Sequence, residues 1–285
     1  MKDRILNDFS LQTTDFSIVE NFPDEAFVNE HFGMIRNSRP YMNHFVSPGQ
    51  LYHFSEGRID WVTAGSADIE LTLDEYHIEK GDIMLLAPET IMELKSCSTD
   101  YTLMGVIYKD MIPLGNNLVV RADEAGWRET VRLADILWDI ARQKPFRLTT
   151  VNYLLSAIIS DIHDINRAQQ EKKPDAAKTR REQVFARFKK LVNENCCHHR
   201  NVPFYAGELA LTPHYLSSLI SAVSGRSVMH WINRATLIQA KVLLKDRDML
   251  VGEVADRLNF PSQSAFGTFF RRETGMTPSE YQRNS

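Results

Sequence analysis

The sequence has few cysteines and no long apolar run, and each shortage excludes a class of protein. Only three of its 285 residues are cysteine, Cys97, Cys196 and Cys197, and the adjacent pair could bridge only in a strained ring, so no disulfide framework is expected. No stretch approaches the roughly 20 consecutive apolar residues of a membrane-spanning helix. The opening residues, MKDRILNDFSLQTTDF, lack the basic and apolar regions of a signal peptide. We therefore expect a cytoplasmic protein with no membrane partner.

Catalytic and metal-binding signatures are also missing. The sequence contains no nucleophile elbow, phosphate-binding loop or metalloprotease histidine pair. Four potential zinc ligands stand in a row in CCHHR, residues 196–200, but four consecutive side chains cannot all converge on one tetrahedral ion, which favours a loop. We expect neither enzyme activity nor a metal or other cofactor.

The net charge of −4 conceals two parts of opposite sign. From Lys178 onward the chain carries 16 Lys and Arg against 9 Asp and Glu, whereas the preceding part carries 17 against 28. A basic part beside an acidic one indicates that the C-terminal part contacts a polyanion.

Residues 30–110 contain several short runs typical of β-strands, namely GRIDWV, ADIELTL, YHIEKGDIMLLAP and DYTLMGVIY. In ADIELTL, Ile69, Leu71 and Leu73 alternate with polar residues, as they do in a half-buried strand. Short strands at such spacing predict an all-β sandwich or barrel.

The apolar period becomes helical over residues 124–167. Val151, Leu155, Ile158 and Ile162 form a coiled-coil-like seam there. Two alternatives remain open for this seam: packing against the chain's own barrel, or pairing across a homodimer.

The next segment, RAQQEKKPDAAKTRREQ, has no apolar residue larger than alanine and includes Pro174. It predicts a linker over residues 168–180 between a first domain, residues 1–167, and an all-α domain, residues 181–285.

The all-α part contains an internal repeat, in which AGELALTPHYLSSLISAVSG aligns with ADRLNFPSQSAFGTFFRRETG. Each copy predicts a short helix, a tight turn and a second helix, which begins at Thr212-Pro213 or Pro261-Ser262 and stops at Gly225 or Gly275. The turn suits Asn259, which tolerates a left-handed conformation, better than its counterpart Ala210. The pattern predicts two helix-turn-helix units joined by a helix of roughly 17 residues, about 26 Å long, which could hold their second helices in successive major grooves of DNA.

The stretch VADRLNFPSQSAFGTFFRRETGMTPSEY resembles the signature of the AraC/XylS family of bacterial transcription regulators, and the resemblance covers the whole C-terminal domain. It implies that the second helix of each unit reads double-stranded DNA. By position it indicates His214, Ser217 and Ser218 in the first unit, and Gln263, Ser264 and Thr268 in the second, with Arg271 and Arg272 at phosphates. The family commonly has arginine at the positions of Ser218 and Thr268, so bidentate guanine contacts are not available there.

The β-rich part resembles the cupin-type sensor domain that often precedes this module. In IEKGDIMLLAPET, Gly81-Asp82 and Pro88 match the second cupin motif, but Ile91 and Met92 lie where a metal-binding histidine would fall, and no His-x-His occurs upstream. The resemblance implies a barrel that holds a small-molecule effector, in some relatives a sugar. Side chains able to stack on or hydrogen-bond such a ligand are Arg36, Tyr52, His53, Arg58 and Trp61.

These features predict a sequence-specific DNA-binding regulator, dimeric, with the effector and RNA polymerase as further partners. In the expected mechanism the effector shifts the placement of the DNA-binding domains through the 124–167 helices. The alternatives are a barrel that only dimerises the chain, and a cupin enzyme fused to a DNA-binding module.

Overall fold

The structure, a computed structural model, describes residues 6–41, 44–109, 117–172, 179–246 and 248–284. The chain divides into two compact units. The first, a β-rich unit, contains most of residues 8–172, and the second, a helical unit, contains residues 179–284. The predicted fold class, an all-β part followed by helices and then an all-α part with two helix-turn-helix units, is confirmed. No helix in the described part of the chain is long and apolar enough to cross a membrane.

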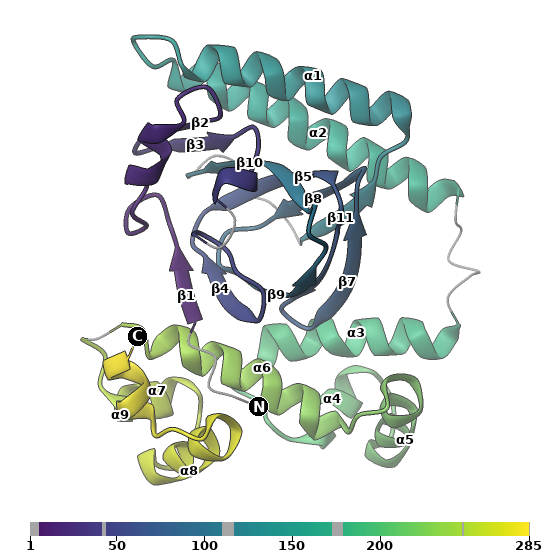
Figure 1. The fold of residues 1–285 in the computed structure, drawn as a ribbon. Helices are drawn as coiled ribbons and strands as arrows, with labels where there is room; N and C mark the ends of the chain where they lie inside the picture. The colour runs from purple at the N-terminus through teal and green to yellow at the C-terminus, as the bar shows by residue number, and fades with distance from the viewer. Residues whose placement is uncertain (1–5, 42–43, 110–116, 173–178, 247, 285) are drawn as a thin grey trace. The chain divides into compact units, whose positions relative to one another are not determined.

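The β-rich unit contains two sheets that face each other (Figure 1). One has five strands in the spatial order β1 (Leu6–Phe9), β4 (Gln50–Phe54), β9 (Thr90–Cys97), β6 (Ser66–Leu71) and β7 (Asp74–Glu79). The other has six, in the order β11 (Leu118–Arg121), β8 (Asp82–Leu86), β5 (Gly57–Ala64), β10 (Thr102–Tyr108), β3 (Phe32–Ile35) and β2 (Ala26–Val28). Two short 3-10 helices, η1 (Ser17–Asn21) and η2 (Arg39–Tyr41), complete this part.

An apolar core fills the space between the sheets, and period-two alternation decides which side chains reach it. Phe54, Ile69 and Leu94 come from the five-stranded sheet, and Val62 and Leu86 from the six-stranded one, and all are buried. The side chains between these positions point to the opposite face of their sheet.

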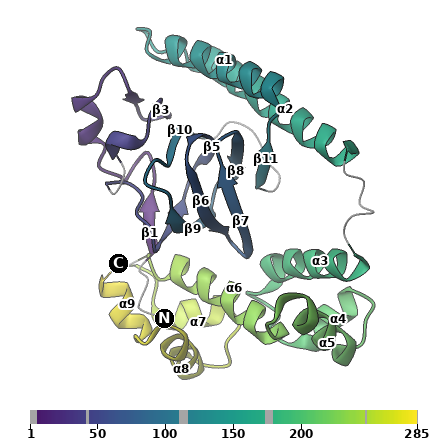
Figure 2. The same ribbon diagram turned by 45° about the vertical axis from the view of Figure 1, so that its right-hand side comes forward.

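Two helices, α1 (Glu124–Ala141) and α2 (Leu148–Lys172), pack together on the outer face of the six-stranded sheet (Figures 1 and 2). Asp123 starts α1 by accepting a hydrogen bond from the backbone N–H of Gly126 at 3.0 Å. The indole of Trp61, on β5, donates to Oγ1 of Thr130, on α1, at 3.2 Å. Helix α2 continues to Lys172, beyond the predicted end at residue 167, so the first residues of the predicted linker are helical.

The helical seam faces this sheet. Val151, Leu155, Ile158 and Ile162 have no exposed surface and pack into the core that α1, α2 and the six-stranded sheet share. Their prediction as dimer contacts is wrong, because side chains without exposed surface cannot touch a second copy. The alternative, packing against the chain's own β-rich part, is what the structure shows.

The helical unit consists of α3 (Arg180–Asn195), α4 (Val202–Glu208), α5 (Pro213–Ser224), α6 (Val228–Leu243), α7 (Val251–Arg257), α8 (Gln263–Thr274) and α9 (Pro278–Asn284). Helix α6 takes part in two cores. Its first half packs with α3, α4 and α5, and its second half with α7, α8 and α9 (Figure 1). A capping box starts α9, since the N–H of Thr277 donates to Glu280 at 2.7 Å and the N–H of Glu280 donates to Oγ1 of Thr277 at 3.2 Å.

The CCHHR segment connects α3 to α4 and also contacts the second repeat. The guanidinium of Arg200 lies 3.4 Å from the ring centre of Phe260 and donates to the carbonyl of Asn259 at 2.7 Å. The side-chain amide of Asn259 donates to the carbonyl of His198 at 2.8 Å. Among the described residues, no three His, Cys, Asp or Glu side chains are grouped so as to hold a metal ion. The contacts of Arg200 and His198 therefore join the connection before the first repeat to the turn of the second repeat.

Replacing Ile158 by alanine should lower the free energy of unfolding of the β-rich unit by about 2–4 kcal/mol, because the change leaves a cavity at a fully buried site. The control, Ile136→Ala, alters a side chain on α1 that is 49% exposed and should cost much less. Denaturant unfolding with light scattering tests both variants. An Ile158→Ala protein of unchanged stability that forms a smaller oligomer would contradict the packing described above.

Candidate nucleic-acid interface and interior cavity

The second helix of each repeat begins and ends at the residues that the sequence predicts. For α5, Oγ1 of Thr212 accepts from the N–H of Tyr215 at 3.2 Å, and the helix ends at Gly225, whose φ is 66°. For α8, Oγ of Ser262 accepts from the N–H of Ala265 at 3.1 Å, and the helix ends at Gly275, whose φ is 85°. Glycine accommodates these left-handed stops without strain.

Each of these helices has one buried face and one exposed face. Leu216, Leu219 and Ile220 anchor α5, and three phenylalanines at the aligned positions anchor α8, namely Phe266, Phe269 and Phe270. The turns that precede both helices contain a left-handed residue, Ala210 with φ 54° and Asn259 with φ 53°. The two units therefore share backbone geometry as well as sequence pattern.

Most of the predicted DNA-reading side chains are exposed on these two helices. His214 and Ser218 are exposed on α5, and Gln263, Ser264 and Thr268 on α8. Ser217 differs, because it is half-buried and its hydroxyl donates to the carbonyl of Pro213 at 2.8 Å. The hydroxyl of Thr268 also donates within its helix, to the carbonyl of Ser264 at 3.0 Å.

Of the exposed faces of α5 and α8, only that of α8 carries lysine or arginine side chains. Helix α5 contains no lysine or arginine, whereas α8 ends with Arg271 and Arg272, both exposed. Arg272 pairs with Glu273 at 2.6 Å, and Arg271 lies close enough to Glu280 for its charge to lower the pKa of that carboxyl. Both guanidiniums are exposed, so either can reach a phosphate.

Sequence reasoning missed Tyr215, which follows His214 and is 50% exposed. The available signal was that Leu216, Leu219 and Ile220 already occupy the buried face of the same helix. An exposed aromatic ring beside His214 adds a stacking or methyl-contacting surface to α5.

A sequence model of the family described as helix-turn-helix domain matches residues 205–284. Residues 205–284 are a helix-turn-helix domain.

Two curated relatives are each similar to a part of the chain. An uncharacterized HTH-type transcriptional regulator, YijO of Escherichia coli, is 25% identical over 142 residues, which are 50% of this chain and 48% of YijO. The HTH-type transcriptional activator RhaR of Yersinia pseudotuberculosis is 32% identical over 68 residues, which are 24% of this chain and 23% of RhaR. The chain thus covers less than half the length of these relatives.

Among solved structures, ToxT from Vibrio cholerae is 16% identical, with a TM-score of 0.37 over 89% of this chain and 98% of that one. The DNA-binding domain of AdpA, solved with a target DNA, is 25% identical, with a TM-score of 0.33 over 35% of this chain and 90% of that one. Scores of this size do not establish a common fold, so the helix-turn-helix domain rests on its own sequence match and geometry.

In the β-rich unit, the five residues predicted to contact an effector do not come together. Arg36 pairs with Asp135 on α1 at 2.6 Å, and Trp61 lies on the outer face of its sheet against α1. The hydroxyl of Tyr52 accepts from the N–H of Ser47 at 2.7 Å, and His53 is held between two carboxylates. Of the five, Arg58 lines an interior cavity of the described β-rich unit.

We name this space the Arg58 cavity. Its volume is about 60 Å³, counted as the space that the centre of a water molecule can reach. Its polar lining includes Arg58, Asp60 and Tyr41, and its apolar lining includes Phe9, Phe45, Ile69, Met84, Met92 and Leu94. The sequence GRIDWV could have indicated this cavity. Its two charged residues, Arg58 and Asp60, are two positions apart in an apolar strand and must therefore lie on the same face of the sheet.

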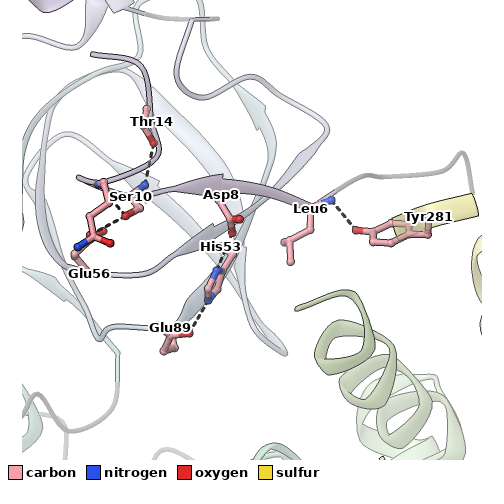
Figure 3. Close-up of polar contacts among 9 residues, drawn as sticks. Leu6, Asp8, Ser10, Thr14, His53, Glu56, Glu89 and Tyr281 are labelled. Carbon is pink, nitrogen blue, oxygen red and sulfur yellow. Dashed lines mark hydrogen bonds and ion pairs between the residues drawn. The ribbon is translucent and has the colours of Figure 1, made fainter. Parts of the chain in front are cut away.

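His53 instead joins three segments of the β-rich unit, as Figure 3 shows. Its Nδ1 lies 3.0 Å from Asp8 on β1, and its Nε2 lies 2.9 Å from Glu89 in the turn between β8 and β9. Burial alone would lower the pKa of His53, but the hydrogen bond to Asp8 and the charge of Glu89 raise it above its ordinary value. In its charged form His53 can donate to both carboxylates and so joins β1 to β4 and to the β8–β9 turn.

The raised pKa of His53 predicts a pH-dependent stability. The charged form stabilises the fold fully below the unfolded pKa of about 6.5, and this contribution is lost as the pH rises through the higher folded-state pKa. Denaturant unfolding at several pH values should show a decline in this range that His53→Gln reduces. The pKa of His77 is raised as well, by its hydrogen bond to Asp68, but this pair is exposed, so His77→Gln should reduce the decline less. An equal decline in His53→Gln and the unaltered protein would show that His53 is not its source.

The left-handed turn of the first unit predicts a stabilising substitution. Ala210→Gly should raise the free energy of unfolding of the helix-turn-helix domain by up to about 1 kcal/mol, because glycine adopts a positive φ without strain. Ala222→Gly, at an exposed position inside α5, should lower it by about 1 kcal/mol. Thermal unfolding of the two variants tests whether the first is stabilised and the second destabilised. Destabilisation by Ala210→Gly would show that the turn does not strain alanine.

Proposed function

We propose that the chain is a sequence-specific DNA-binding transcription regulator of the AraC/XylS type, whose β-rich unit binds a small-molecule effector. The observation that carries this proposal is the pair of exposed helices, α5 and α8, held in one unit by the shared helix α6. Helix α6 has 16 residues and is about 24 Å long, a length suited to placing two second helices in neighbouring turns of the major groove.

Base readout in this proposal is divided unevenly between the two helices. Gln263, exposed in the first turn of α8, can form the bidentate contact with adenine that glutamine makes in a major groove. On α5, His214 and Tyr215 offer one hydrogen-bonding ring and one aromatic surface. Because Ser218 and Thr268 replace arginines, DNA shape contributes more to specificity than guanine contacts do.

The effector part of the proposal is supported by the interior cavity. A unit that served only to dimerise the chain would need no polar groups facing an internal space. Pairing of two copies, contact with RNA polymerase and action in the cytoplasm belong to the same proposal, with the seam on α2 excluded as the dimer surface because it is buried. The likeness of the β-rich unit to cupins also stays a prediction.

The proposal predicts different defects for the two kinds of contact on α8. Gln263→Ala should weaken binding to the best site by about 10-fold while leaving binding to random DNA unchanged, because it removes a base contact. Arg271→Ala should weaken binding to the best site and to random DNA by a similar factor, because it removes a phosphate contact. It should also reduce the slope of log K against the logarithm of the salt concentration by about one.

The measurement begins with selection of bound fragments from genomic DNA by the full chain, followed by titration of the best fragment at two salt concentrations. The matched control is Arg128→Ala, which removes an exposed arginine of α1, outside the helix-turn-helix domain. Equal, salt-sensitive binding to all fragments by the unaltered protein would contradict sequence-specific recognition.

A further inference from the structure

Arg58 is buried inside the β-rich unit with part of its guanidinium unused. Its Nε and Nη2 donate to the two carboxylate oxygens of Asp60 at 3.1 and 2.9 Å. The rings of Phe9 and Phe54 lie 5.0 and 4.5 Å from the guanidinium carbon. The side chain is only 7% exposed, yet its Nη1 has no hydrogen-bond partner in the described part of the protein.

A second donor without a partner lines the same cavity. Tyr41, at the end of η2, is buried, and its hydroxyl has no hydrogen-bond partner among the described residues. Buried polar groups in folded proteins are nearly always hydrogen-bonded, so two exceptions beside one cavity indicate an acceptor that binds there. Asp60 accepts from Arg58 and offers no donor in its ionised form.

The cavity sets the size and character of this acceptor. A volume of about 60 Å³ corresponds to roughly four to six water molecules, which is the space of a small organic molecule. A neighbouring cavity of about 40 Å³ shares Phe9, Phe45 and Arg58 and offers room for a slightly longer ligand. Met84 and Met92 line the larger cavity with flexible side chains that can adjust to different apolar shapes.

The charges that line the cavity favour a ligand with a neutral headgroup over one with an anionic headgroup. Asp60 is 2% exposed and already neutralises Arg58. A carboxylate ligand would therefore bring an additional negative charge into a buried site without a free countercharge, which is unfavourable. A neutral carbonyl oxygen accepts from Nη1 without that cost.

We propose that the Arg58 cavity binds a small, mainly apolar molecule through one neutral carbonyl oxygen, which accepts from Nη1 of Arg58, with the hydroxyl of Tyr41 as a second donor to the ligand. That this molecule acts as the effector rests on the function proposed above. Ketones, lactones, esters and amides with about seven non-hydrogen atoms are the chemical class that fits.

Four probes that share a six-membered ring test the headgroup: cyclohexanone, cyclohexanol, cyclohexanecarboxylate and methylcyclohexane. Their binding to the full chain is measured by saturation-transfer NMR, and the dissociation constants by titration. Cyclohexanone should bind at least 10-fold more tightly than methylcyclohexane or the carboxylate, with the alcohol between them. Tighter binding of the carboxylate would overturn the neutral headgroup. Equal binding of methylcyclohexane would overturn the role of the hydrogen bond, and a cavity that admits none of the four would overturn the site.

Variants locate the contact. Arg58→Lys keeps a cation beside Asp60 but removes the Nη1 donor, and should weaken cyclohexanone binding by at least 10-fold. Tyr41→Phe removes one hydroxyl and should weaken it several-fold. The matched control is Tyr108→Phe, because the hydroxyl of Tyr108 is also buried without a partner among the described residues but Tyr108 lines neither cavity. Unchanged affinity in both Arg58→Lys and Tyr41→Phe would overturn the assignment.

A parallel DNA titration separates this inference from the proposed function. If cyclohexanone binds as expected and alters the affinity for the selected DNA fragment, both are supported. Binding with unchanged DNA affinity and unchanged transcription in a purified system supports the cavity ligand and overturns its role as effector. Specific DNA binding by a protein that takes up no probe overturns the cavity ligand and leaves the regulator supported.

Discussion

Strand β5 is buried on both faces, and the β-rich unit depends on this constraint. Ile59 and Trp61 point outward into the core with α1 and α2, whereas Arg58 and Asp60 point inward, between the sheets. Residues two positions apart share a face, so the strand itself provides the carboxylate that a buried guanidinium requires. A register shift of one residue would place both charges beneath the helices. The alternation of side chains along β5 therefore produces both the surface on which the helices pack and the polar wall of the cavity.

The helical unit depends in a similar way on α6. Each half of this helix belongs to a different core, so neither repeat can complete its apolar packing without it. Arg200 and Asn259 add hydrogen bonds that join the connection before the first repeat to the turn of the second. Two helices that must contact one rigid ligand together need such a fixed spacing, because any freedom between them would be lost on binding.

The two exposed helices differ in what they can contribute to binding. Helix α8 combines Gln263 in its first turn with Arg271 near its end, so it offers a base-reading group and a phosphate-binding charge. Helix α5 has no fixed charge and presents His214 and Tyr215. Under the proposed function, α8 would supply most of the electrostatic attraction, and α5 would refine the choice of site through short-range contacts.

Local patterns in the sequence predicted the strands β5, β6, β7, β8 and β10, the helical regions and the repeat, but not β1, β4, β9 or β11, which pair with strands distant in sequence. Thr212, Gly225 and Gly275 act through hydrogen bonds and backbone angles within a few residues of themselves, so their roles are visible without the rest of the fold. Most of the predicted DNA-reading residues are exposed for the same reason, since helical periodicity separates them from the buried face.

The tertiary structure alone decided what the apolar faces cover and which polar side chains meet. The α2 seam with Ile158 had two open partners, and the choice depended on the six-stranded sheet, which forms from strands distant in sequence. Trp61 and Arg58 were grouped by their chemistry, but strand alternation separates them onto opposite faces. The sequence by itself determined the helices of the repeat, their caps and the strands with clear alternation, because these follow from short-range interactions. Partners across the core and the lining of the cavity follow from long-range pairing, which no local pattern contains.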